Sequence, residues 1–198
     1  MAHTLSRREM MMIAAAAAAV TPIGASAQSA AQARTLVDSV VASINAVIAS
    51  GKSEAGMIAD FESIFDRYSD VATIARYALG TDARSASRAD LDAFTVAFRG
   101  YISRKYGRRF REFIGGRVEV RGERAIPRGI QVETMVVLRG QAPFRVDFHV
   151  SDASGKTLFF NIIIEGIDML LSERTEIGAM LDARRGNLAQ LIADLRTL

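Results

Sequence analysis

The apolar residues of this chain change their spacing at Gly115-Gly116, in the middle of the sequence. Before these glycines they recur every three or four positions, which is the spacing of a helix with one buried side. After them, apolar and polar residues alternate, which is the spacing of a strand with one buried face. Helical spacing returns near the end of the chain. This order of segments predicts a single α+β domain.

Three helices are expected in the first part of the chain. The first covers residues 35–49, with Gly51 as its stop, and the second begins after Ser53. Asp70 is placed to cap the third helix, which ends before Gly80. Because the turns between these segments are short, the three helices should pack closely together.

A longer helix with an aromatic side is expected from Ser87 to Gly115. Ser87 and Asp90 form a capping box at its start, and aromatic residues recur along one side as far as Phe113. The other side is basic and continues an arginine-rich stretch to Arg128. This stretch is either an ordinary solvated surface or a contact for anionic headgroups or a partner. Nucleic-acid binding is not favoured, because the aromatic residues lie opposite most of the arginines.

Four strands are expected after the glycines, in a twisted antiparallel meander with hairpin turns at residues 139–141 and 152–155. The last strand should place Leu158, Phe160, Ile162 and Ile164 on one face. Two helices close the chain, the second capped by Asn187. The predicted fold class is therefore α+β, a twisted four-stranded antiparallel sheet with helices that cover one face and enclose an apolar cavity. A thick, filled core is the alternative explanation of the apolar strands.

The first 27 residues have the three parts of an export signal. Arg7-Arg8 precede an uncharged run over residues 10–20, and Ala25-Ser26-Ala27 forms an A-x-A cleavage site. The paired arginines resemble a twin-arginine signal, with a general secretion signal as the alternative. The run has about half of the roughly 20 residues needed to cross a bilayer. We therefore expect a cleaved signal over residues 1–27 and one periplasmic domain over residues 28–198.

The composition of the chain argues against most kinds of active site. Of the 198 residues, 49% are apolar. None is cysteine, and the absence of cysteine excludes disulfides, thiolate metal sites and cysteine nucleophiles. Removal of the signal leaves His149 as the only histidine, and no nucleotide-binding, serine-hydrolase or zinc-protease motif occurs. Alternation puts His149 on one strand face with Asp147 and Arg145, which indicates a polar surface row. Glu165 ends the last strand. No metal site is expected.

Three segments carry a family pattern. They are residues 77–87, which begin Tyr77-Ala78-Leu79-Gly80, residues 94–102, which contain Phe98-Arg99, and residues 161–169, which contain Glu165-Gly166. In this order they resemble the MlaC family of periplasmic phospholipid-transport proteins, the toluene-tolerance auxiliary component of an ABC transport system. The resemblance covers most of the chain after the signal. Two departures concern the cavity mouth: the final hairpin has no Trp, and Asn161 stands where the family often has Asp.

The resemblance implies a monomeric carrier that is not an enzyme and uses no cofactor. It would hold a phospholipid between the sheet and the helices. It would pass this lipid between an outer-membrane lipoprotein and porin complex and an inner-membrane ABC transporter with an MCE-domain protein, and so maintain outer-membrane lipid asymmetry. One rival hypothesis is a periplasmic enzyme for a small apolar substrate, with Glu165 or His149 as the acid/base group. The other is a structural adaptor with a filled core.

Acyl chains need an apolar cavity to cross an aqueous compartment, because each buried methylene gains roughly 0.8 kcal/mol relative to water. The lining is expected to come from the aromatic side of the long helix and the apolar strand faces. The expected lipid-binding residues are Phe94, Phe98, Tyr101, Val136, Val146, Phe148, Phe160, Ile162 and Met169. Arg99 and Arg104 are the expected contacts for a headgroup or a partner.

Overall fold

The structure is a computed structural model that describes residues 23–198, with side chains from Ser29 onward except that of Phe110. The expected export signal therefore falls mainly outside the described residues and stays a prediction. Within the described part of the chain, no helix combines the length and the apolar character needed to cross a membrane.

The second and third helices begin at the capping residues that the sequence indicates. The first three helices are α1 (Ile23–Ala49), α2 (Glu54–Tyr68) and α3 (Val71–Leu79), and a short 3-10 segment η1 (Gly80–Arg84) follows. Ser53 accepts a hydrogen bond from the Gly56 amide, and Asp70 accepts one from the Thr73 amide. The predicted starts of α2 and α3 are thus confirmed, whereas α1 begins earlier than residue 35.

The prediction of one unbroken helix from Ser87 to Gly115 is wrong at its end. Helix α4 covers Arg88–Gly107, and the 3-10 segment η2 (Arg108–Phe113) follows it. At Gly107 the backbone of α4 approaches α2 so closely that an added Cβ would lie 2.9 Å from the Cα of Ile58. This contact requires glycine, which is a poor helix former, and the α-helix stops there.

The sheet has five strands and not four. They are β1 (Arg117–Ile126), β2 (Gly129–Val137), β3 (Phe144–Ser151), β4 (Leu158–Ile164) and β5 (Ile167–Asp168), all antiparallel and in sequence order. The fifth strand was missed because it has two residues. It exists because Glu165 and Gly166 adopt positive φ angles of 48° and 82°, which turn the chain back along β4.

The expected alternation along β4 is broken by a bulge at Phe160. Val150 pairs with Phe159 while His149 pairs with Asn161, so Phe160 is an extra residue in the strand. Phe159 is consequently the buried aromatic residue, in edge contact with Phe148 at 5.5 Å between ring centroids. A period-two pattern cannot show such a shift of register. The prediction that Phe160 continues the regular alternation with Ile162 is therefore wrong.

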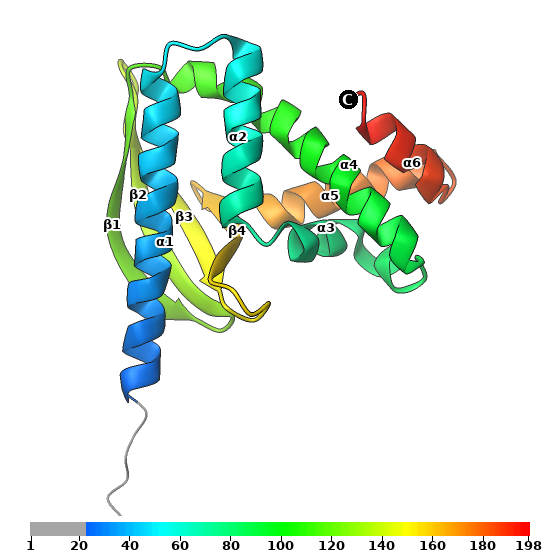
Figure 1. Cartoon of the computed structure of the whole chain (residues 1–198), viewed down its shortest axis with the longest axis horizontal. Coiled ribbons are helices and arrows are strands. Elements are labelled where there is room, and N and C mark those ends of the chain that lie inside the picture. The colour runs from blue at the N-terminus through cyan, green and yellow to red at the C-terminus, as the bar shows by residue number, and fades with distance from the viewer. Residues whose placement is uncertain (1–22) are drawn as a thin grey trace, which may run out of the picture.

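The helices cover one face of the sheet and extend beyond it. Figure 1 shows α1 lying along the sheet in front of β1 and β2, with α2 beside it. Helices α3 and α4 lie farther from β1, together with α5 (Met169–Ala183) and α6 (Leu188–Leu195), which carries the C-terminus. Asn187 caps α6 as predicted, because its side chain accepts a hydrogen bond from the Gln190 amide.

Candidate functional site: an apolar cavity between the sheet and the helices

A cavity of about 560 Å³ lies between the inner face of the sheet and the helices. It is partly open to solvent, so the expectation of an enclosed cavity is met only in part. Most of the side chains around it are apolar, and the polar ones are Arg109, Glu112, Thr134, Gln141, Asn161, Ser172 and Glu173. The helical wall includes Val40, Ile44, Phe61, Ile64, Phe65, Ile74, Phe98, Ile102, Tyr106, Met169 and Leu170, and the apolar residues from the sheet are Val118, Val136, Phe144, Val146, Phe148, Phe159, Phe160, Ile162, Ile164 and Ile167.

Strand register creates the sheet wall of the cavity. Thr134 of β2 pairs with Val146 of β3, and Phe148 of β3 pairs with Ile162 of β4, so these four side chains emerge on one face. The hydroxyl of Thr134 donates to the carbonyl of Val146 at 2.7 Å, which satisfies the one alcohol of this group. The wall therefore presents an almost uniformly apolar surface to the cavity.

Helix α4 supplies the opposite wall from positions four residues apart. Phe98, Ile102 and Tyr106 lie one above the other on one side of the helix and reach the cavity. The connection between α2 and α3 is held against the sheet, because the amide of Asp70 donates to the carbonyl of Phe159 at 2.8 Å. The helical wall is thus fixed at the edge of the sheet by a backbone contact.

The open end of the cavity differs in chemistry from its interior. Arg109, Glu112 and Gln141 line the cavity and are exposed, and they come from η2 and the turn between β2 and β3. By contrast, Phe98 and Phe148 are buried. An amphipathic ligand with an apolar tail and a polar head matches this distribution of side chains.

The structure brings seven of the nine predicted lipid-binding residues to the cavity wall. They are Phe98, Val136, Val146, Phe148, Phe160, Ile162 and Met169. Phe94 and Tyr101 lie elsewhere. Phe94 is fully buried and stacks on Phe98 with 5.7 Å between ring centroids, and Tyr101 donates a hydrogen bond to Glu176. Both contribute to packing between helices, because the aromatic side of α4 is wider than the part that faces the cavity.

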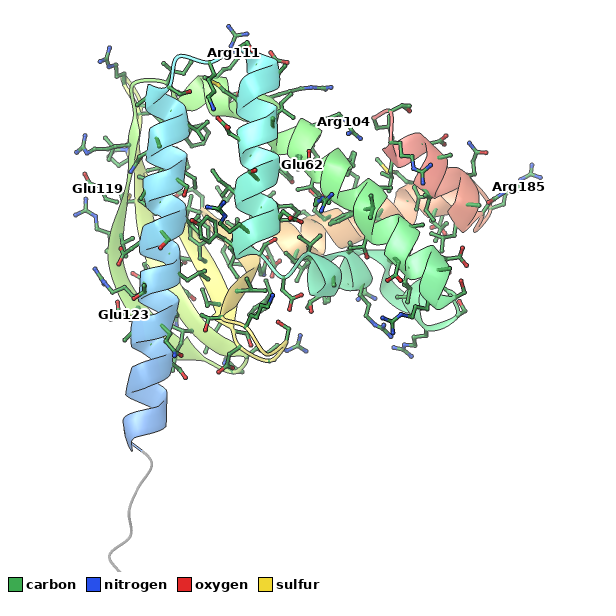
Figure 2. All side chains as sticks on the ribbon, in the orientation of Figure 1. Glu62, Arg104, Arg111, Glu119, Glu123 and Arg185 are labelled. Atoms are coloured by element: carbon green, nitrogen blue, oxygen red, sulfur yellow. The ribbon has the colours of Figure 1, made fainter. Side chains whose placement is uncertain are left out.

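The two arginines expected to contact a headgroup already have partners inside the molecule. Arg99 lies 2.6 Å from Asp66 and 3.4 Å from Glu62, which is labelled on α2 in Figure 2. Arg104, also labelled there, donates to the main-chain carbonyl of Leu195 at the end of α6. Neither residue lines the cavity, whereas Arg109 does. Helical spacing from Phe98 through Ile102 and Tyr106 could have pointed to Arg109.

A polar cluster joins α4 to α5 beside the cavity. Lys105 donates to Glu173 at 2.8 Å and also to Glu176, and Tyr106 donates to Glu173. Burial alone would lower the pKa of Lys105, but its hydrogen bonds to the two glutamates raise that pKa overall. Burial, together with the bond to Glu173, raises the pKa of Tyr106. Sequence reasoning missed Glu173, since nothing in the order of residues brings positions 105 and 173 together.

The candidate acid/base residues lie away from the cavity wall. His149 is on the outer face of β3, with its ring 6.0 Å from that of Phe160, and burial lowers its pKa. Its neighbour Asp147 is buried and accepts hydrogen bonds from Gln131 and Arg145. Glu165 accepts a hydrogen bond from the Arg145 amide in the turn before β5. No group of three or more potential metal ligands occurs within residues 23–198.

Comparisons with known proteins agree with the resemblance of the three segments. A family model described as MlaC protein matches residues 34–197. The fold is similar to a solved structure of a phospholipid-binding protein from Ralstonia solanacearum in complex with a phospholipid. That comparison has a TM-score of 0.65 and 18% sequence identity, and it covers 84% of this chain and 94% of the other.

Proposed function

The chain belongs to the MlaC family, and on this premise we propose that it is a periplasmic carrier which binds a phospholipid through an acyl chain in the cavity. The observation that carries the proposal is the largely apolar wall between sheet and helices, to which η2 and the turn between β2 and β3 add the exposed polar side chains of Arg109, Glu112 and Gln141. Because each methylene gains roughly 0.8 kcal/mol on leaving water, a lipid tail is the natural occupant of such a wall.

The size of the cavity suits one long acyl chain. A methylene group occupies roughly the 30 Å³ that a water molecule takes in the liquid. A cavity of about 560 Å³ therefore has room for a chain of ordinary membrane-lipid length, and a second chain would require the walls to move apart. The headgroup would then lie at the mouth beside Arg109, since Arg99 and Arg104 already have intramolecular partners.

Transport by such a carrier requires loading and unloading at two membranes. We propose that the donor and acceptor are an outer-membrane lipoprotein and porin complex and an inner-membrane ABC transporter with an MCE-domain protein, and that the flux maintains outer-membrane lipid asymmetry. An apolar cavity and a bilayer interior offer a methylene similar surroundings. The transfer free energy between them is accordingly small compared with transfer into water. A docking partner therefore needs to change this transfer free energy only slightly to load or unload the carrier.

A binding role is favoured over an enzymatic one. His149 and Glu165, the acid/base candidates, lie outside the cavity lining, and the lining is dominated by side chains that transfer no protons. We expect His149→Ala and Glu165→Gln variants to retain full lipid binding. An enzyme that used either residue would lose its activity in the corresponding variant.

The proposal is tested by native mass spectrometry of residues 28–198 after incubation with phospholipid vesicles. We expect a bound phospholipid in the wild-type protein. Ile162→Lys places a charge in the cavity and should abolish binding, whereas Ile163→Lys, one residue along β4 and on the outer face opposite Asp147, should bind lipid normally. Absence of bound lipid from the folded wild-type protein would contradict the proposal.

A further inference from the structure

One carboxylate oxygen in the cavity wall lacks a partner. Glu173 lies on α5, lines the cavity and has only 4% of its surface exposed. Its Oε2 atom is buried and has no hydrogen-bond partner within the described residues. A buried acceptor without a partner is costly, and native proteins leave few of them. Glu173 is a residue of the cavity wall, so a ligand in the cavity lies next to it and can bring a donor that the described residues do not supply.

The other oxygen of Glu173 is fully engaged. Oε1 accepts hydrogen bonds from the ammonium of Lys105 and from the hydroxyl of Tyr106. Lys105 is shared with Glu176 on the next turn of α5, so the position of its ammonium is fixed from two sides. These contacts hold the carboxylate in one orientation and leave Oε2 as the acceptor for a further donor.

We propose that Oε2 of Glu173 accepts a hydrogen bond from a hydroxyl group of the bound lipid. The inference rests on the proposed function and names a chemical preference within the same cavity. A hydroxyl is neutral and donates one hydrogen bond, which is what the site lacks. Glu173 thereby becomes a specificity-determining residue for lipids that carry an alcohol close to the cavity mouth.

Other polar groups of a phospholipid fit this position less well. An ester offers only acceptor oxygens, which would face the carboxylate without a hydrogen bond between them. A headgroup ammonium would have to leave water and come close to the positive charge of Lys105, 2.8 Å from Glu173. The hydroxyl avoids both costs.

The position of Glu173 indicates where the alcohol would lie in the lipid. Glu173 is one helical turn beyond Met169, and Tyr106 is one turn before Arg109 at the mouth. A group bound there lies at the junction between head and tail. The free glycerol hydroxyl of a monoacyl phospholipid meets this condition, and so does a hydroxyl near the start of a hydroxylated acyl chain. The cavity volume, which suits one chain, is consistent with the first source.

The experiment compares three lipids with one headgroup and one chain length, each titrated into residues 28–198. The first is palmitoyl-lysophosphatidylcholine, and the second is its 2-deoxy analogue, which lacks only the glycerol hydroxyl. The third is the 2-deoxy analogue with a 3-hydroxypalmitoyl chain. We expect the wild-type protein to bind a hydroxyl-bearing lipid about tenfold more tightly than the 2-deoxy lipid. A preference for the first lipid assigns the glycerol hydroxyl, and a preference for the third assigns the chain hydroxyl.

Two variants connect this preference with Glu173. Glu173→Leu removes the acceptor and should lower the tenfold ratio to about one. Asp182→Leu is the matched control, because Asp182 is an exposed carboxylate of the same helix that does not line the cavity, and it should keep the ratio. The comparison of lipids on the wild-type protein needs no substitution, so a failure of Glu173→Leu to fold does not remove the test.

Equal affinity of the wild-type protein for all three lipids would overturn the inference, as would a preference that survives in folded Glu173→Leu. In both cases lipid still binds, and the proposed function stands. If neither these lipids nor diacyl phosphatidylcholine bind, the proposed function fails and the inference fails with it. The two failures are therefore distinguishable in a single set of titrations.

Discussion

The inner face of the sheet has two ends with similar residues and different packing. At one end, Val132 and Val150 are 0% and 2% exposed and do not border the cavity. At the other end, Phe144, Val146 and Ile162 are only partly buried and form its wall. We refer to these as the packed end and the hollow end. Branched and aromatic side chains occupy both, so residue type does not decide which end is filled.

The helix above the sheet accounts for the difference. Near the packed end, Arg34 in the first half of α1 pairs at 2.7 Å with Glu123, labelled on β1 in Figure 2, and Glu123 is the register partner of Val132. Near the hollow end, the Asn45 side chain bonds both the amide and the carbonyl of Val118 at the start of β1. Helix α1 is thus fixed along the β1 edge, and the space toward β3 and β4 is left to α2 and α4, which do not fill it.

The largest effect is expected at Phe148, where the two ends meet. Phe148 is buried, lines the cavity and contacts Phe159 edge-on. Phe148→Ala should lower the free energy of unfolding by about 3 kcal/mol or more, because it removes a buried ring from the packed side of the boundary. Urea denaturation measures this loss. Phe160→Ala is the control and should cost clearly less, since Phe160 is a partly exposed bulge residue. Equal losses of unfolding free energy in the two variants would show that Phe148 and Phe160 are equally well packed.

A pair of enlargements separates the two ends directly. Val132→Phe should lower the free energy of unfolding by about 1–3 kcal/mol, because a filled core has no room for a ring. Val146→Phe enlarges a side chain of the cavity wall, and we expect a change within about 0.5 kcal/mol. The same urea titrations provide both values.

The two enlargements should also differ in lipid binding. Val146→Phe narrows the cavity and is expected to weaken binding of the palmitoyl lipid severalfold, while folded Val132→Phe protein should bind it normally. If Val146→Phe is as unstable as Val132→Phe and its lipid affinity is unchanged, the hollow end is part of the core.

The sequence was a good guide wherever one residue and its near neighbours decide the structure. Ser53, Asp70, Ser87 and Asn187 each cap the helix expected of them, since a cap involves residues only three positions apart. Alternation also identified the four long strands and which face of β3 is apolar. It could not identify the bulge at Phe160, because a bulge depends on pairing with a second strand.

The candidate site was predictable in its chemistry but not in its extent. Seven of nine expected residues line the cavity. Periodicity assigned the correct face to those on α4 and on the regular part of the sheet, whereas Phe160 reaches the cavity from a bulge. The same periodicity cannot tell Phe94, packed among helices, from Phe98, at the cavity wall. Glu173 was absent from the prediction, because its role depends on Lys105 and Tyr106, far away in sequence. Contacts across such separations follow from the fold and from no local pattern.

The smallest effect is expected on the outer face behind the packed end, where His149 pairs with Gln131. Burial lowers the pKa of His149 below its ordinary 6.5, and Arg124 lowers it further, while Asp168 and Asp147 partly oppose the shift. As the pH falls below about 6.5 the unfolded chain gains a proton at this histidine before the folded chain does, so stability should fall in that window. Carboxylates such as Glu176 and Asp194, whose pKa values are lowered in the fold, act only at more acidic pH. In residues 28–198, His149→Gln should therefore flatten the dependence of the unfolding free energy on pH between 7 and 5. This change in free energy should be smaller than the losses expected for Phe148→Ala and Val132→Phe. An unchanged slope in urea titrations across that range would show that the fold does not lower the pKa of His149.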